Sequence, residues 1–307
     1  MNKMDRRSFI GTVAAAGAAF LTGTPAARAT ERGYYRQFRF DHRVLAIASG
    51  PDPAQNTRAA VEALGGMKKL VSQGAKVVIK PNLAWNQAPE VAATTNPAVI
   101  RQLVKMCQEA GAGQIIITDH ICDSPPESVF QTTGAAQVAQ NTGATLKAAQ
   151  KPSDFTSIAI PDGRLLTEDT CLKDILEADV FINVPVAKSH GAARLTLGMK
   201  NSMGCNWDRG RWHRSKSLDQ CIADYASSVR PDLTVLDATR IMLRQGPKGP
   251  GPTQDVQKVI AGVDPVAVDA YGATLFDISP DQVKYIKLAG EMGLGEMDLA
   301  KMILKEV

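Results

Sequence analysis

The chain has 307 residues, with 35 Lys and Arg against 31 Asp and Glu and a formal net charge of +4. The first 29 residues hold four basic residues and one acidic residue, so the rest of the chain is nearly neutral. This balance argues against a nucleic-acid partner. None of the five cysteines forms a C-x-x-C pair, so a ferredoxin-type iron–sulfur cluster is not expected within this chain alone.

The N-terminus resembles a twin-arginine export signal. Arg6 and Arg7 precede the apolar run Gly11–Leu21, and a small-x-small end follows at 27–29. The run is shorter than the ~20 residues that span a bilayer. We therefore predict cleavage after Ala29, the twin-arginine translocase as a transient partner, a periplasmic location and no stable membrane span after cleavage.

The mature chain is predicted to be a linker over residues 30–43 and a single α/β domain over residues 44–307. Apolar runs of strand length alternate with stretches of helical spacing, which indicates a mainly parallel sheet with helices on both faces. Residues 143–167 are less regular and predict a small β excursion. The expected strands are 44–48, 76–80, 114–118, 180–184, 233–236 and 256–261, and the expected helices are 54–73, 98–110, 170–177, 217–229, 265–275, 280–290 and 297–305.

Chemically distinctive residues follow several of these strands. Ligands of open α/β sheets gather beyond the carboxyl ends of the strands, so such residues are the best candidates for a site. Lys200 and Asn201 add a further polar pair in a Gly-rich segment. The strand-end candidates are Lys80, Asn82, Asp119, His120, Cys122, Lys188, His190 and Asp237.

Seven distinctive segments occur in a fixed order along the mature chain. They are K-P-N-L at 80–83, T-T-N-P at 94–97, Asp119, P-V-A-K-S-H at 185–190, L-G-M-K-N-S-M-G at 197–204, G-P-K-G-P-G at 246–251 and D-P-V-A-V-D at 264–269. Together these segments resemble the family known as domain of unknown function 362 (DUF362). Many relatives are described as iron–sulfur proteins because they carry appended ferredoxin-like cysteines, which this chain lacks. The resemblance covers nearly all of the mature chain and implies a redox-linked role without a cluster of its own.

The three lysines Lys80, Lys188 and Lys200 predict a pocket for a small anion, either a carboxylate or a phosphate. Asn82 and Asn201 would add amide hydrogen bonds to the same ligand. The alternative is that the lysines are solvated surface residues and that the asparagines form turns. The family resemblance favours the pocket.

Two kinds of chemistry fit the remaining polar residues. In the first, His190, Asp119 and Lys188 handle protons, since imidazole titrates near neutral pH. In the second, Asp119, His120, Cys122 and His190 hold a metal ion, which is the one cofactor that these residues suggest. The alternative is that the histidines are structural and hydrogen-bonded.

Three further features have two readings each. Asp237, at a predicted strand end, and Asp269 are either functional or structural, and Asp264 is a helix N-cap. The loop at 207–213 is either a lid over the pocket or an exposed loop without a role. The segment 246–252 holds too many prolines to offer a run of N–H donors, so nucleotide binding of the standard kinds is not expected.

The sequence thus predicts an exported enzyme that binds a small anion or a metal ion and has a redox-linked role. Two alternatives remain open. One is a non-catalytic periplasmic protein that binds a ligand or metal, and the other is an accessory factor that docks on a redox-enzyme partner.

Overall fold

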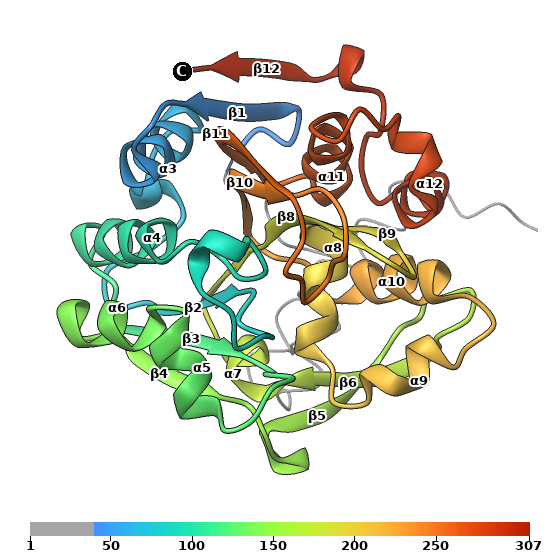
Figure 1. The fold of residues 1–307 in the computed structure, drawn as a ribbon, viewed down its shortest axis with the longest axis horizontal. Helices are drawn as coiled ribbons and strands as arrows, with labels where there is room; N and C mark the ends of the chain where they lie inside the picture. The colour runs from blue at the N-terminus through green and yellow to red at the C-terminus, as the bar shows by residue number, and fades with distance from the viewer. Residues whose placement is uncertain (1–39) are drawn as a thin grey trace, which may run out of the picture.

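The computed structural model describes residues 40–307. The predicted export signal and residues 30–39 of the predicted linker lie outside this range. The described chain is built around one ten-stranded sheet with helices against both of its faces (Figure 1). Eight of the strands follow the order β12-β1-β11-β10-β7-β2-β3-β4, and β8 and β9 extend from β10.

Most neighbouring strands of this sheet run parallel, as the alternation of strands and helices predicts. Only the pairs of β11 with β1 and β10, and of β8 with β9, are antiparallel. The strands are β1 (Val44–Ser49), β2 (Lys76–Pro81), β3 (Gln114–Asp119), β4 (Thr145–Ala148), β7 (Val180–Val184), β8 (Val186–His190), β9 (Arg194–Thr196), β10 (Leu233–Met242), β11 (Thr253–Gly262) and β12 (Ile303–Glu306).

Side chains alternate between two apolar layers along each central strand. In β2, Val77 and Ile79 pack in one layer and Val78 in the other, because successive residues of a strand face opposite sides. The first layer is covered by α3 (Pro53–Ala63), α4 (Pro97–Glu109) and α6 (Ala135–Thr142), and the second by α10 (Leu218–Ser228), α11 (Pro265–Thr274) and α12 (Lys284–Glu291) (Figure 1). The predicted α/β class with helices on both faces is confirmed.

Shorter helices lie in the connections. They are α5 (Pro126–Thr132), α7 (Lys173–Leu176), α8 (Gly198–Asn201) and α9 (Arg209–His213). Two longer helices begin where a cap followed by proline predicts. The Asn96 side chain accepts a hydrogen bond from the Ala98 amide at the start of α4, and Asp264 caps α11 in the same way.

The helices predicted over 54–73 and 170–177 form only in part. The helix predicted over 54–73 ends at Ala63, because Gly65 and Gly66 follow with φ of +117° and +87°, which a helix cannot contain. The helix predicted over 170–177 survives only as α7. The residues before it form β6 (Glu168–Leu172), which pairs with β5 (Phe155–Ala159) in a separate two-stranded sheet.

Some residues form strands of the main sheet although the sequence pattern predicts another structure for them. The predicted helix over 297–305 is wrong, since Ile303–Glu306 forms β12 beside β1. The predicted β excursion at 143–167 is divided, because β4 joins the main sheet beside β3 while β5 lies in the small sheet. The strand predicted over 233–236 continues to Met242, which places Asp237 inside β10 rather than at its end.

Candidate functional site

One cavity of about 360 Å³ gathers most of the polar residues that the sequence singles out. It lies beyond the ends of β2 and β3 and along β8, with α8 and the segment after it forming another wall. Parallel strands end at the same edge of a sheet, so residues distant in sequence meet there. The predicted site residues that line this cavity are Lys80, Asn82, Asp119, His120, Cys122, Lys188, His190, Lys200 and Asn201.

A buried ion pair closes one side of the cavity. The Lys80 Nζ lies 2.8 Å from the Asp119 Oδ1, and both side chains are almost fully buried. The second carboxylate oxygen accepts the amide of Leu83 at 2.7 Å. A Cβ atom at Gly204 would come within 2.8 Å of the Lys80 Nζ, so glycine lets the chain pass directly against this pair. Asp119 therefore already has a cationic partner within the protein.

Lys188 is fully buried, and its Nζ donates to neutral oxygens. The amine donates to the carbonyl oxygen of Ala93 and, at 3.3 Å, to the Oδ1 of Asn82. Burial lowers the pKa of Lys188 to about 7, and the nearby charge of Lys200 acts in the same direction. An anionic ligand would stabilise the charged form of a buried lysine that lacks a carboxylate partner.

The amine of Lys200 has weaker hydrogen-bond acceptors than the amine of Lys188. Within residues 40–307, the hydrogen-bonding partner of its Nζ is the thioether sulfur of Met203 at 3.1 Å, a weak acceptor. Burial lowers the pKa of Lys200 to about 8, and the charge of Arg209 also lowers it. The Arg209 guanidinium reaches the cavity wall, where it donates to the carbonyl oxygen of His120 at 2.7 Å and to the Sγ of Cys122 at 3.1 Å.

A chain of three asparagines fixes the amide groups in the cavity. Asn183 on β7 donates from Nδ2 to the carbonyl oxygen of Gly198, which can only accept. Its own oxygen accepts from Asn201 at 2.9 Å, and the Asn201 oxygen accepts from Asn82 at 2.9 Å. The Asn82 oxygen is thereby aimed at Lys188. Asn183 was not among the predicted site residues, although a polar residue inside an apolar strand is a usable signal.

His190 is held as a neutral hydrogen-bond donor. Its Nδ1 lies 3.1 Å from the amides of both Ala192 and Ala193 and must accept from them, so we assign the ring proton to Nε2. Burial, together with the nearby charge of Lys200, lowers the pKa of His190 to about 3. The ring stacks on His213 with centroids 6.0 Å apart, and His213 also lines the cavity.

His120 is likewise oriented by the backbone. Its Nδ1 lies 2.9 Å from the carbonyl oxygen of Asn206, and its ring stacks on Trp207 with centroids 5.2 Å apart. Burial lowers the pKa of His120. Among residues 40–307, no group of three or more His, Cys, Asp or Glu side chains is arranged to share a metal ion. Metal binding by Asp119, His120, Cys122 and His190 stays a prediction.

Some side chains of the segment 207–213 line the cavity, and others lie in the core. Arg209 and His213 line the cavity, whereas Trp212 is fully buried and donates from Nε1 to Asp169. Thr196 is a further lining residue that the sequence did not single out, because a threonine in a strand carries no signal of its own. Its hydroxyl is buried and has no hydrogen-bond partner in the described part of the chain.

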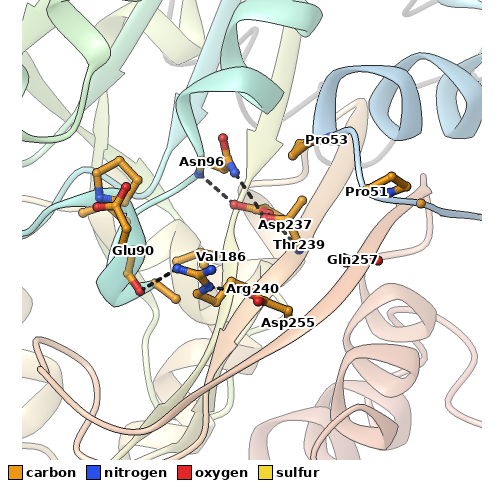
Figure 2. Close-up of a pocket in the computed structure, with 14 residues that line it drawn as sticks. Pro51, Pro53, Glu90, Asn96, Val186, Asp237, Thr239, Arg240, Asp255 and Gln257 are labelled. Carbon is orange, nitrogen blue, oxygen red and sulfur yellow. Dashed lines mark hydrogen bonds and ion pairs between the residues drawn. The ribbon is translucent and has the colours of Figure 1, made fainter.

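Asp237 lies on a second cavity, of about 310 Å³, rather than on the lysine cavity. Its carboxylate accepts the Asn96 amide at 2.7 Å and the Thr239 hydroxyl at 2.7 Å, and thereby ties β10 to the start of α4 (Figure 2). Arg240 lies on the same cavity and pairs with Asp255 (Figure 2). Through these contacts Asp237 has a structural role, the connection of β10 with α4.

Asp269 does not line the lysine cavity, but it positions one of its walls. The Asp269 carboxylate accepts the amides of Gly198 at 2.6 Å and Met199 at 2.9 Å, at the start of α8, which carries Lys200 and Asn201. The carboxyl group is fully buried, and burial raises its pKa to about 7. Gly198 is required there, since a Cβ would come 2.7 Å from the Asp269 Oδ1.

The fold and the site define an α/β protein with a buried, cation-rich cavity at the strand ends. The chain belongs to the family described as Domain of unknown function (DUF362), whose model matches residues 77–274. The family that the sequence segments predict is thus confirmed. A thylakoid-associated protein of Synechocystis sp. is 29% identical over 252 residues, which is 77% of this chain and 74% of that protein.

Two solved structures resemble the fold more distantly. A protein from Thermotoga maritima matches 79% of this chain with a TM-score of 0.44, and the lactate racemase apoprotein from Thermoanaerobacterium thermosaccharolyticum matches 78% with a TM-score of 0.47. Both are 11% identical to this chain, which spans 60% and 58% of their lengths. At these values the likeness says nothing of ligand or activity. Within residues 40–307, no helix is long and apolar enough to cross a bilayer.

Proposed function

We propose that this chain is an exported enzyme that binds a small anionic molecule in the lysine cavity and acts on it there. One observation carries the proposal. Four cationic side chains line the cavity, and the one carboxylate among the lining residues, Asp119, is already paired with Lys80. The positive charge of Lys188, Lys200 and Arg209 has no carboxylate partner on the cavity wall, and an anion would supply it.

The energetics of burial support this occupant. Removing an ammonium group from water is costly unless a counter-charge or strong acceptors replace the hydration shell. The Lys188 amine has two neutral acceptors, and the Lys200 amine has a thioether. Burial lowers the pKa of Lys188 to about 7 and that of Lys200 to about 8. A bound carboxylate or phosphate would stabilise both ammonium groups.

The lining residues would divide the work. Lys188, Lys200 and Arg209 would neutralise the ligand, while Asn82 and Asn201 would orient it. We propose His190 as a neutral donor from Nε2, because its Nδ1 is engaged by two backbone amides. Asp119 would hold Lys80 and the Leu83 amide in place.

The direct test is a panel of anions against the purified protein. Phosphate, sulfate, acetate, succinate, pyruvate and glyoxylate would be screened by thermal shift at low salt. We expect at least one to stabilise the wild type, to fail with Lys200→Met, and to stabilise Lys105→Met as well as the wild type. Lys105 is a matched control because it is exposed on α4. The proposal fails if no anion stabilises the wild type or if both variants respond equally.

A non-catalytic binding protein is the second candidate, and the state of His190 favours it. A histidine whose pKa burial lowers to about 3 is uncharged at neutral pH, and so there is no imidazolium to act there as a general acid. Turnover separates the two candidates. A ligand that binds and is recovered unchanged after prolonged incubation supports the binding protein, whereas conversion supports the enzyme.

Export by the twin-arginine route is part of the proposal. Arg6, Arg7 and the short apolar run support it, and the relative in Synechocystis sp. is named for association with thylakoids. Replacing both arginines with lysine should retain the protein in the cytoplasm, as measured by cell fractionation. The redox-linked role and the docking on a redox enzyme stay predictions, tested by co-purification from the periplasm and by the absorption spectrum of the exported protein.

A further inference from the structure

Lys200 differs from the other lysines of the cavity in what holds its amine. The Nζ of Lys80 is fixed by Asp119 at 2.8 Å and by the carbonyl oxygen of Pro81 at 2.9 Å. The Nζ of Lys188 is engaged by Ala93 and Asn82. Lys200 has only the Met203 sulfur within the described residues. A thioether accepts weakly, so this contact costs little to break and leaves the amine free to react.

The groups around Lys200 suit a reacting amine. His190 and His213 line the same cavity as Lys200, and the charge of Lys200 lowers the pKa of both imidazoles. His190 presents an N–H donor, and His213 is exposed at the cavity rim, where it can exchange protons with solvent. At pH 7, a lysine pKa of about 8 gives a neutral fraction larger by on the order of a hundredfold than that of an ordinary lysine. Burial lowers the pKa of Lys188 still further, to about 7, but its amine is held by Ala93 and Asn82, so the weak contact of Lys200 and not its pKa distinguishes it.

Resting on the proposed function, we propose that the anionic substrate carries a carbonyl group and that Lys200 is the catalytic residue that forms a Schiff base with it. The class is a small aldehyde or 2-oxo carboxylate. Its carboxylate would be neutralised by Lys188 and Arg209, which are the remaining cations of the cavity without a carboxylate partner among the lining residues. The cavity of about 360 Å³ accommodates a molecule of this size.

The step balances without any further reactant. The lone pair of the neutral Lys200 amine attacks the carbonyl carbon, a C–N bond forms, and the C=O π electrons move to oxygen. A proton passes from nitrogen to that oxygen to give the carbinolamine. The hydroxyl group then leaves as water after it takes up one proton from solvent, and the protonated imine remains. Amine, carbonyl compound and one solvent proton become the protonated imine and water, and nothing is oxidised or reduced.

Trapping of the imine is the test. The purified full chain would be incubated with pyruvate or glyoxylate and sodium cyanoborohydride, and the adduct would be located by intact mass and peptide mapping. We expect one adduct per chain, on the peptide that carries Lys200, formed at least about tenfold faster than on any exposed lysine because of the larger neutral fraction. Lys200→Arg should abolish it, and Lys105→Arg should leave it unchanged.

The outcomes separate this inference from the anion-binding proposal. Adducts scattered over exposed lysines, in the same pattern in wild type and Lys200→Arg, would overturn it. Thermal stabilisation by pyruvate or glyoxylate without an adduct would also overturn it while leaving anion binding intact. If neither anion stabilises nor labels the protein, the carbonyl chemistry is rejected, and the rest of the anion panel decides on the proposed function. Circular dichroism of Lys200→Arg and Lys200→Met identifies a variant that fails to fold.

Discussion

The Lys80 ammonium and the Asp119 carboxylate form an ion pair of 2.8 Å, although the two residues come from neighbouring strands and are both nearly inaccessible to water. Because Asp119 is paired with Lys80, it does not serve as the counter-charge of the other cations of the cavity. Lys188 and Lys200 are consequently buried with neutral acceptors alone, and this imbalance is the basis of the proposed anion site.

Asp119→Asn should destabilise the protein by about 3–5 kcal/mol, because it leaves the buried charge of Lys80 without its partner. Urea unfolding at neutral pH measures this change. Glu109→Gln is the matched control, since it breaks the exposed pair with Arg58 and should cost no more than about 1 kcal/mol. Equal effects of the two variants would show that burial of the Lys80–Asp119 pair does not matter.

Asn183→Leu should lower stability by about 1–3 kcal/mol and weaken anion binding. The change leaves the Asn201 amide without its acceptor, so Asn201 and Asn82 lose their fixed orientation. Asn141→Leu, on the exposed surface of α6, is the control and should change neither quantity much. A stable Asn183→Leu protein with wild-type affinity would refute the positioning role of the asparagine chain.

Asp269 should make the protein less stable as the pH rises from about 4 to about 7. Its pKa is raised on folding, so the folded state binds more protons than the unfolded state within this window. The stability that the protonated form gives is complete below the unfolded pKa and is lost as the pH rises through the folded one. Urea unfolding of the wild type and Asp269→Asn at pH 5 and pH 7.5 should show a steeper decline in the wild type. Identical slopes would contradict it.

His190→Gln should keep most of the anion affinity, whereas His190→Ala should lose about tenfold, or roughly 1.4 kcal/mol. A glutamine amide can replace the Nε2 donor, but alanine cannot. The His190-dependent part of the affinity should also be flat between pH 5 and pH 8, because the pKa of this imidazole lies at about 3. A midpoint near pH 6.5 that disappears in His190→Ala would assign His190 to proton transfer instead.

The fold was largely predictable because the apolar strands and the cap-plus-proline helix starts are local signals. The failures arise where pairing with a distant strand decides the structure. Residues 303–306 become β12 because β1 offers an open edge, and residues 168–172 pair with β5. Neither partner is visible in a local window of sequence, since tertiary pairing overrides local propensity.

The candidate site was predictable only as a set of strand ends. Lys80 and Asp119 end their strands, as expected, and their meeting follows from parallel topology. Lys188 and His190 lie on β8, a strand that the sequence pattern did not predict. Asp237 does not line the lysine cavity, because it lies inside β10, which continues to Met242. Which lysine keeps an unpaired amine could not be predicted, because this depends on the placement of Asp119 and Asn82.

The most direct test of the central claim is calorimetry of anion binding in two buffers that differ in ionisation enthalpy. Binding of an anion favours the charged ammonium, so at pH 8.5 it should be accompanied by uptake of about one to two protons, owing to the lowered pKa values of Lys188 and Lys200. The affinity should fall as the pH rises through about 7 to 8, and Lys200→Met should reduce the proton uptake while Lys105→Met leaves it unchanged. Anion binding without proton uptake, or uptake unchanged in Lys200→Met, would contradict the assignment of this cavity.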